Sequence, residues 1–403
     1  MATTETTAAP DRAGEPAGRS RREFLRAVGI GAATVAVAGI GAASYRVYDT
    51  AVLDPGGGRA YEPWRQWRQT PGPLGAVAAA VLAASPHNTQ PWQFEIGSDA
   101  IDVFVDRSRG TGAIDPLRRE QHVGVGCAIE NLALAADARG LRPTVTLLPD
   151  GPGAARVARV ALSAGAPRPS PLYEAIGRRH TNRGPYDGRP VPAGTLAALA
   201  GPSIPSELGV QWITDPADRA ALGRLLVDAA VALTQDEQQS RDGFAWFRGH
   251  DDDVQRHRDG LVLDGQGLSP LVLGVAKVMP PSSRTAGDGF WVTQTRTVHT
   301  ATAAAYGVIT VADPDEVRTQ LDAGRLLQRI HLAATSRGIA LQHMNQVTER
   351  IDREATSGAR ATFAPRFAAL LPSGAAPLLT FRVGYAVRAA RPTPRRSAAE
   401  VAR

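Results

Sequence analysis

The residues of this 403-residue chain whose types could do chemistry are concentrated in one short polar segment, Ser85-Pro86-His87-Asn88-Thr89-Gln90-Pro91-Trp92. The segment offers two hydroxyl groups, two side-chain amides and one imidazole, which can hydrogen-bond to the polar edge of a planar ligand. A capped turn would use the same residue types to satisfy its own backbone groups. The residue types therefore leave a ligand-binding loop and a structural turn both open.

A second polar segment, Arg178-Arg179-His180-Thr181-Asn182-Arg183, carries three guanidinium groups and a hydroxyl. Arginine can donate two parallel hydrogen bonds to phosphate oxygens, so this spacing is typical of a phosphate clamp. In an arginine-rich chain an exposed basic turn has the same composition. The segment indicates an anion site only if another feature points to a bound phosphate.

The hydrophobic pattern places the first polar segment between a helix and a strand. An alanine-rich helix over residues 74–84 must end before Pro86, because the residue that precedes a proline is disfavoured in the α region. Alternating residues then predict a hairpin, followed by a long helix that ends at Gly140 and by two more strands. The predicted strands cover residues 92–96, 101–106, 144–148 and 156–162, and the long helix covers residues 119–139.

A proline-rich joint at residues 167–171 separates this region from a second series of elements. The later long helix is predicted to begin at Asp313, with Pro314 in its first turn and Gly338 after its last turn. The predicted strands of the second series cover residues 210–214, 305–311 and 378–387, and its helices cover residues 215–235 and 313–337. Each series therefore arranges strands around one long helix.

The long helices of the two series are similar in sequence. Residues 126–141 align with residues 324–339 without a gap, at a constant offset of 198 residues. The alignment predicts two related halves in one chain, while chance similarity of two alanine-rich helices is the alternative. Residues 241–300 have no counterpart in the first series. Such a long irregular insertion is typically a lid or a mobile segment.

The octapeptide at residues 85–92 closely resembles the flavin-contacting loop of the nitroreductase family, above all its Acg-like actinobacterial branch. The Asp115-Pro116 and Arg119-Glu120 pairs resemble the same branch. Nitroreductases hold the ribityl phosphate of FMN with an R-x-S/T-x-R/K pattern, which Arg179, Thr181 and Arg183 match. They also place a basic residue after a strand that resembles Arg382-Val383-Gly384-Tyr385, and Arg395 or Arg396 stands at that place.

This resemblance implies an α+β, nitroreductase-like fold in the form of a tandem pseudo-dimer that binds FMN non-covalently. The flavin loop is intact only in the first half, because its counterpart near residues 201–207 lacks the Asn and the Gln-Pro-Trp. The clamp is intact only in the second half, since the region around Arg65 and Arg68 has nothing like it. One working site is expected, with Gln342 and His343 along the edge of the isoalloxazine ring. The implied FMN-binding residues are Ser85, Pro86, His87, Asn88, Thr89, Gln90, Arg179, Thr181, Arg183, Gln342, His343, Arg395 and Arg396.

The activity that the resemblance implies is two-electron reduction of nitroaromatic or quinone-like acceptors with NAD(P)H, by ping-pong transfer through FMN. Hydride transfer takes place at flavin N5 and needs no catalytic side chain. The alternative is a protein that sequesters flavin beneath a lid, with little or no turnover. A third reading is a relic fold that binds no FMN.

The amino-acid composition limits which other partners and ligands are expected. The net charge of +6 comes from scattered arginines around a single lysine, Lys277, with no aromatic-interleaved basic stripe, so no nucleic-acid partner is expected. The single cysteine, Cys127, rules out an intrachain disulfide and is expected to be a small core residue. The acidic run at residues 251–253 lies between His250 and His257 without the frame of a metal site, so a solvated charge run and no metal are expected.

The first residues are typical of an export signal. Paired Arg21 and Arg22 precede an uncharged segment over residues 27–43, which is the layout of a twin-arginine signal. That segment is shorter than the roughly 20 apolar residues of a membrane span, and it has no clear cleavage site, so an uncleaved membrane anchor stays open. The twin-arginine translocase is thus an expected partner, and the expected location is extracytoplasmic. An exported reductase would lack ready NAD(P)H, which favours the flavin-binding alternative or another electron donor.

The predicted organisation has five parts. They are a disordered start with the signal over residues 1–43, a linker over 44–73, a first half over 74–165, a second half over 166–388 with its insertion over 241–300, and a basic tail over 389–403.

Overall fold

The computed structural model describes residues 56–403 apart from 202–204, 206 and 281, so the predicted signal over residues 1–43 lies outside the described residues. Its strands form two four-stranded antiparallel sheets, ordered β1-β2-β4-β3 and β5-β6-β8-β7. The first sheet contains β1 (Trp92–Ile96), β2 (Ala100–Val105), β3 (Leu141–Leu147) and β4 (Arg156–Ala164). The second contains β5 (Leu208–Ile213), β6 (Ala305–Val311), β7 (Ala340–His343) and β8 (Ala376–Gly384).

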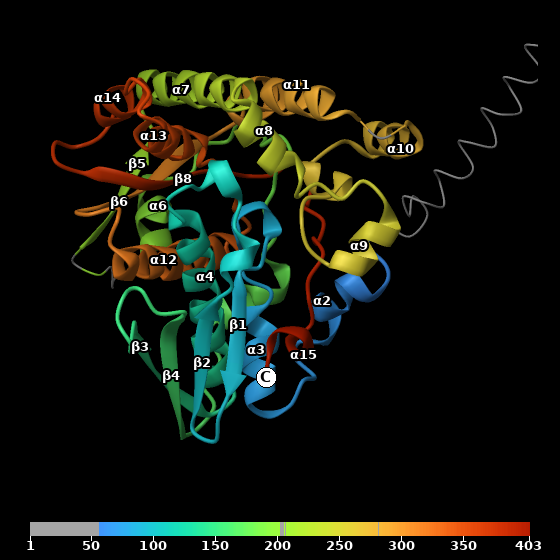
Figure 1. Cartoon of the computed structure of the whole chain (residues 1–403), viewed down its shortest axis with the longest axis vertical. Coiled ribbons are helices and arrows are strands. Elements are labelled where there is room, and N and C mark those ends of the chain that lie inside the picture. The colour runs from blue at the N-terminus through green and yellow to red at the C-terminus, as the bar shows by residue number, and fades with distance from the viewer. Residues whose placement is uncertain (1–55, 202–204, 206, 281) are drawn as a thin grey trace, which may run out of the picture.

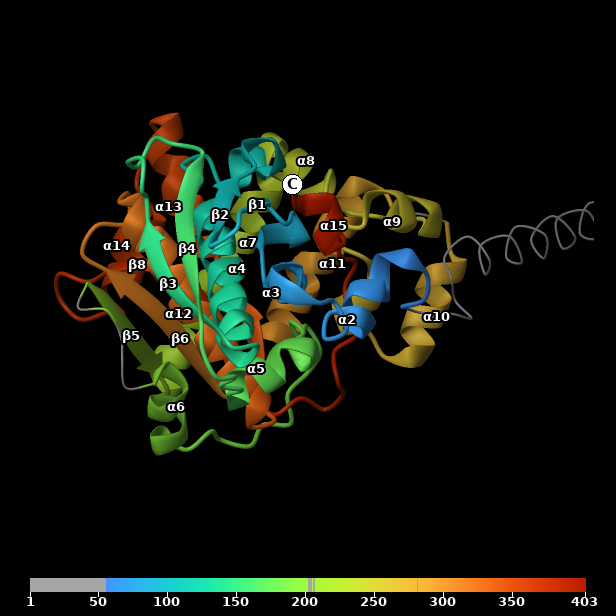
Figure 2. The same ribbon diagram turned by 90° about the horizontal axis from the view of Figure 1, so that it is seen from below.

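The two halves repeat one topology, because β1, β2, β3 and β4 stand in the same order as β5, β6, β7 and β8. In each half a long helix precedes the third strand: α4 (Arg119–Ala138) before β3 and α12 (Val317–Ser336) before β7. The two helices pack against each other in the middle of the molecule, with one sheet on either side (Figures 1 and 2). The predicted α+β fold of two related halves is confirmed.

The aligned residues of α4 and α12 form the contact between the two halves. A Cβ atom on Gly126 would lie 2.2 Å from the Leu321 carbonyl oxygen, and one on the aligned Gly324 would lie 2.1 Å from the Val123 carbonyl oxygen. Close approach of the two backbones therefore requires glycine at both positions.

Two polar pairs beside these glycines repeat the same symmetry. The Gln328 amide donates to Asn131 Oδ1 over 2.8 Å, and the Arg329 guanidinium donates to Glu130 Oε1 over 2.7 Å. At the offset of 198 residues Glu130 aligns with Gln328 and Asn131 with Arg329, so each pair is the image of the other. Such reciprocal pairs are what a two-fold interface between like subunits produces.

The start of α12 differs from its prediction. The helix begins at Val317 with Glu316 at the N-cap, whereas the sequence predicts a start at Asp313. The Asp313 carboxylate instead accepts the Asp315 N–H over 2.8 Å and forms a separate turn ahead of the helix. An aspartate followed by proline suits such a turn as well as it suits a helix start.

The predicted linker and basic tail both contain ordered elements in the residues that the structure describes. A 3-10 turn at Arg59–Tyr61 leads into a short helix, α2 (Glu62–Gln66), and Trp67 is buried in the core that the two halves share. The C-terminal segment is equally ordered: Arg395 is buried, α15 (Ala398–Val401) follows it, and Arg403 N–H donates to the Phe94 carbonyl over 3.0 Å. The apolar area of the tryptophans and the ordered backbone pairing outweigh the proline and glycine content.

The segment without a counterpart in the first half extends from residue 214 to residue 304, because it is the whole connection between β5 and β6. In the first half a turn at residues 97–99 makes the equivalent connection. The predicted insertion over 241–300 is the later part of this connection. The helices of the connection are α7 (Pro216–Gln235), α8 (Glu237–Phe244), α9 (Asp251–His257), α10 (Pro270–Val278) and α11 (Arg284–Gln294), followed by a π-helical turn at Thr295–His299.

Two further helices, α13 (Gln346–Ser357) and α14 (Phe363–Ala368), lie between β7 and β8. The remaining helices are α3 (Gly72–Ala80), α5 (Pro171–Ala175) and α6 (Ala193–Ala200). Within the part of the chain that the structure describes, no helix is both long enough and apolar enough to cross a bilayer.

Candidate functional site

A cavity of about 880 Å³ lies where the polar loop of the first half meets β7 and the inserted helices of the second half. This volume is in the range of about 300–1,000 Å³ that is usual for pockets that bury small ligands. Both halves contribute to its wall, and so does the insertion. The predicted site residues that line it are Ser85, Pro86, His87, Arg183, Gln342 and His343.

The polar loop is held in a strained conformation. His87, Asn88 and Gln90 have φ values of 45°, 57° and 53°. Residues other than glycine adopt such positive φ values at a cost of about 1 kcal/mol or more each. The Asn88 amide donates to the carbonyl oxygens of Gly260 and Pro394 over 3.1 and 2.9 Å. The insertion and the C-terminal segment therefore impose the shape of the loop.

Three predicted members of the loop do not line the cavity. Asn88, Thr89 and Gln90 are buried, and Gln90 donates to the Arg258 carbonyl over 2.8 Å while its backbone N–H donates to Ser85 Oγ over 3.0 Å. These three residues therefore stabilise the turn itself, which is the structural alternative that the residue types left open. Ser85, Pro86 and His87 face the cavity in front of them.

The arginines predicted to clamp a phosphate lie at and behind one wall of this cavity. Arg183 lines the wall and donates to the Gly265 carbonyl over 3.1 Å. Arg179 is buried and donates to the Leu82 carbonyl over 3.1 Å. Arg395 is also buried and donates to the Ala83 carbonyl over 3.2 Å and to Asn88 Oδ1. The rings of Trp64 and His180 lie beside them, with centroids 4.4 Å apart.

None of these three arginines has an ion-pair partner among the described residues, whereas arginines elsewhere in the described ranges, such as Arg109, Arg119 and Arg248, pair with aspartates. The Nε atoms of Arg179 and Arg395 have no hydrogen-bond acceptor either. Burial lowers the pKa values of Arg179 and Arg183 to about 10, and both remain charged at neutral pH. Burial and the charge of Arg179 lower the pKa of Arg395 as well.

The histidines of this region add no charge at neutral pH. Burial, reinforced by the arginines, lowers the pKa of His87 to about 4 and the pKa values of His180 and His343 to about 3. A buried charge that lacks a partner costs several kcal/mol. The donors and charges of this wall therefore fit an anionic group such as a phosphate.

The other predicted clamp residues are placed differently. Thr181 is partly buried and does not line the cavity. Arg396 lies on the far side of the polar loop, where its guanidinium donates to the carbonyl oxygens of Gln90 and Trp92. Arg396 thus fastens the loop to the C-terminal segment.

The cavity wall also carries two carboxyl groups that the sequence did not reveal as a pair. Glu120 of α4 and Glu349 of α13 line the cavity, and their carboxyl groups hydrogen-bond to each other. Burial raises the pKa of Glu349 to about 8, and burial together with the charge of Glu349 raises the pKa of Glu120 well above its usual range. The pair therefore holds a proton at neutral pH.

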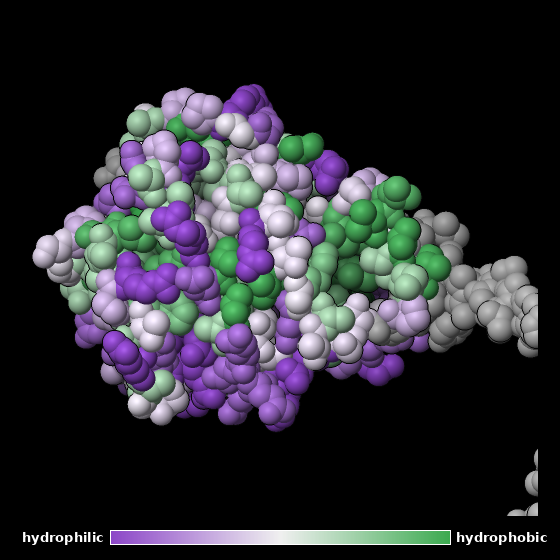
Figure 3. Space-filling view, turned by 90° about the horizontal axis from the view of Figure 1, so that it is seen from above, coloured by the Kyte–Doolittle hydropathy of each residue, from purple (hydrophilic) through white to green (hydrophobic). Residues whose placement is uncertain are grey.

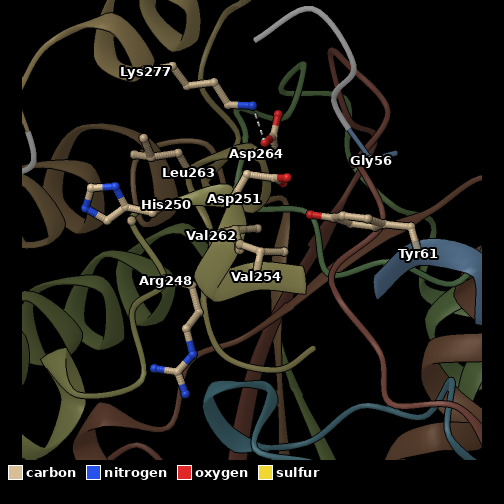
Figure 4. A pocket seen from close by; sticks show the side chains of 11 residues that line it. Gly56, Tyr61, Arg248, His250, Asp251, Val254, Val262, Leu263, Asp264 and Lys277 are labelled. Atoms are coloured by element: carbon tan, nitrogen blue, oxygen red, sulfur yellow. Dashed lines mark ion pairs between the residues drawn. The ribbon is translucent and has the colours of Figure 1, made fainter. Parts of the chain in front are cut away.

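A second, much smaller pocket lies outside this cavity, next to α10 (Figure 4). Lys277 Nζ forms an ion pair with Asp264 Oδ2 over 2.6 Å, and Arg391 reaches the other oxygen of Asp264 over 2.8 Å. Gly56, the first described residue, lines the same pocket. The ion pairs fasten α10 to the rest of the insertion and to the C-terminal segment.

Two other sequence predictions concern metal binding and the single cysteine. In the described ranges no group of three or more His, Cys, Asp or Glu side chains is placed to hold a metal ion. Cys127 is buried in α4, where burial raises the pKa of its thiol to about 12, and it is the core residue that was predicted.

Comparison with known proteins gives similarity over most of the chain. No family model matches. A Mycobacterium tuberculosis H37Rv protein whose name classes it with the NAD(P)H nitroreductases is 26% identical over 342 residues, which cover 81% of this chain and 89% of that protein. A second protein of the same strain, named as the nitroreductase acg, is 32% identical over 75 residues, covering 19% of this chain and 23% of its own.

Solved nitroreductase structures also match in part. The FMN-dependent nitroreductase NfnB from Mycobacterium smegmatis, in complex with NADPH, has a TM-score of 0.35 at 20% identity and covers 58% of this chain and 98% of its own. A nitroreductase with bound FMN from Desulfitobacterium hafniense has a TM-score of 0.32 at 18% identity and covers 56% and 94%.

Proposed function

We propose that this protein is an FMN-dependent oxidoreductase of the nitroreductase family, which reduces a small acceptor with NAD(P)H. The observation that carries the proposal is a group of three arginines without acidic partners, the buried Arg179 and Arg395 and the half-buried Arg183, beside a cavity of about 880 Å³ formed by both halves. The similarity to a protein named as a nitroreductase over 81% of the chain supports it.

In this proposal Arg183 contacts the phosphate of FMN, and Arg179 and Arg395 add positive charge from behind the wall. Ser85, His87, Gln342 and His343 offer hydrogen-bonding groups to the ring system from both halves. Bound FMN would supply the two-electron chemistry. The apolar side chains of the insertion exclude water, and the carboxyl pair of Glu120 and Glu349 keeps a proton beside the acceptor.

The test is flavin uptake followed by turnover. The purified full chain should take up added FMN and acquire the absorbance band of bound oxidised flavin. The loaded protein should then oxidise NAD(P)H when a nitroaromatic or quinone acceptor is added. A protein that takes up no FMN contradicts the proposal and supports the relic reading.

A flavin-sequestering protein is the second candidate, and the position of the insertion favours it. Phe244, Phe247 and Trp291 of the insertion line the cavity and can cover a bound ring. Sequestration predicts FMN uptake without NAD(P)H oxidation, whereas the reductase predicts both. The turnover assay therefore separates the two functions.

We also propose that the chain is exported by the twin-arginine route and is attached to the membrane through residues 27–43. The support is the sequence of the first residues, Arg21 and Arg22 above all. Replacing both arginines with lysine should keep the protein in the cytoplasmic fraction. Export of the double variant at the wild-type level would exclude this route.

A further inference from the structure

Large apolar side chains are exposed mainly at one place on the molecule. Of the eight that are exposed among the described residues, six belong to α8, α11 and the α10 region, and only Leu117 and Val387 lie elsewhere. The six are Phe244, Leu271, Val272, Val275, Met279 and Phe290. Figure 3 shows apolar side chains gathered around a hollow on the right-hand side, where Figure 1 places α10. Single exposed apolar residues are ordinary, but a contiguous group marks an interaction site.

This exposed group, called the α10 rim below, is continuous with the cavity. Phe244, Val272, Val275, Met279 and Phe290 are exposed to solvent and also line the cavity. An apolar surface therefore leads from the outside of the molecule to the inner wall that carries His87 and Arg183. A small polar acceptor would need no such entrance.

The α10 helix is built with its apolar side facing outward. Ser269 caps it by accepting the Val272 N–H over 3.3 Å, and Leu273 lies on its buried side. Lys277, which pairs with Asp264 (Figure 4), lies on the same side. Leu271, which is 79% exposed, and Val275 are four residues apart and so share the opposite side. A helix of a soluble protein normally turns such a stripe toward the core.

The path of the chain indicates what covers this side. Gly56 lines the small pocket that Lys277 of α10 also lines. The uncharged segment over residues 27–43 ends thirteen peptide units before Gly56, a distance of at most about 45 Å when extended. If that segment is held in a membrane, as proposed above, α10 stays within this distance of the bilayer. An outward apolar helix side near a membrane anchor fits the interfacial layer of the lipid.

We infer that the α10 rim rests on a bilayer surface and admits a lipid-soluble quinone from the bilayer into the cavity. The inference rests on the proposed function for its chemistry and narrows the acceptor to this class. With NAD(P)H supplied, as in the test below, the balanced reaction is quinone + NAD(P)H + H⁺ → hydroquinone + NAD(P)⁺; on the exported protein another two-electron hydride donor takes the place of NAD(P)H. Two electrons and one proton come from NAD(P)H as hydride, and the carboxyl pair of Glu120 and Glu349 lies in the cavity to pass on the second proton.

The test compares Leu271→Asp with Val387→Asp in the full chain. Leu271 does not line the cavity, and it occupies the first turn of α10, where an acidic residue is favourable for the helix. Val387 is an exposed apolar residue outside the rim and serves as the matched control. Hydrogen exchange of residues 270–279 is measured with and without phospholipid vesicles, so that binding through residues 27–43 does not enter the readout.

In the wild type and in Val387→Asp, vesicles should slow exchange over residues 270–279 at least about fivefold. Leu271→Asp should lose this protection. Its KM for a long-tailed quinone in vesicles should rise at least about tenfold, while its KM for a short, water-soluble quinone stays within about twofold.

Three results would overturn the inference. They are equal exchange with and without vesicles, equal KM changes for the two quinones, and protection without vesicles that grows with protein concentration, which would mean that a second copy covers the rim. If vesicles protect the rim but no acceptor is reduced, the proposed function fails while the bilayer contact stands.

Discussion

At the scale of single residues, Arg179 is a buried cation that the protein itself does not neutralise. Replacing Arg179 with Met removes the charge and keeps most of the volume. Because burying a charge that lacks an acidic partner is costly, the flavin-free variant should unfold with a free energy unchanged within about 1 kcal/mol, or higher. The Kd for FMN should rise at least about tenfold, or ~1.4 kcal/mol.

Denaturant unfolding without flavin and a fluorescence titration with FMN measure the two effects of Arg179→Met. The control is Arg256→Met on α9, where the side chain is exposed and the charge change is the same. An unchanged Kd in Arg179→Met would remove the anion argument for this site.

Glu349 makes stability depend on pH in a defined direction. Its pKa is about 8 in the folded protein, against an ordinary value of 4.5. Between these two pH values the folded state holds a proton that the unfolded chain releases, so the unfolding free energy falls as pH rises. Glu349→Gln should remove up to about 1.4 kcal/mol of this loss per pH unit. Urea unfolding at pH 5.5, 6.5 and 7.5 measures both slopes, and identical slopes would contradict the assignment.

Individual residues were only partly predictable from the sequence. The polar loop and the arginines were recognisable as types that bind ligands, and Gln342 and His343 do line the cavity. The inward turn of Asn88 was not predictable, because its partner Arg395 is 307 residues away in the chain. The pair of Glu120 and Glu349 was missed for the same reason. The two carboxyl groups belong to different halves of the chain and come together only in the folded structure.

At the scale of elements, the contact between α4 and α12 is set by its two glycines. Gly126→Ala or Gly324→Ala would place a Cβ atom 2.2 or 2.1 Å from a backbone oxygen of the other helix, and backbone cannot move aside easily. Each variant should lose about 1–3 kcal/mol of unfolding free energy. Gly194→Ala in α6, whose Cβ would meet nothing within 4 Å, should be neutral or stabilising by up to about 1 kcal/mol.

Chemical denaturation of the three glycine variants gives the comparison. Equal stabilities for Gly126→Ala and Gly194→Ala would mean that the halves are not packed as closely as described.

The sequence predicted elements well where one local pattern decides them. The strands at Trp92–Ile96 and Ala305–Val311 have the predicted bounds, because alternation or an apolar run leaves little choice. No local pattern indicated the order of residues 59–67 and 389–403, which were predicted as part of a linker and as a basic tail. Trp64 Nε1 donates to the Thr393 carbonyl over 2.7 Å, so each of these segments orders the other across 329 residues.

At the scale of the whole molecule, the two halves share one topology but are unequal in chemistry. Arg65 donates to the Gly56 and Gly58 carbonyls and Arg68 pairs with Glu174; both are exposed and neither lines the cavity, so they do not repeat the group of Arg179, Arg183 and Arg395. We expect one FMN per chain. Flavin released from the saturated, denatured protein and divided by the protein concentration gives the ratio, and a value near two would refute the single-site reading.

The hydrogen bond between Asn88 and Arg395 also sets an order of events during synthesis. Asn88 leaves the ribosome 307 residues ahead of Arg395, an interval of about 15–60 s at 5–20 residues per second. Through that interval the loop lacks the contacts that the C-terminal segment makes to its left-handed residues. Nascent chains that stop short of residue 395 would contain most of both sheets and still be unable to take up the cofactor. Loading is therefore one of the last steps of biogenesis, and bound flavin would report that the chain has been made and folded through residue 395.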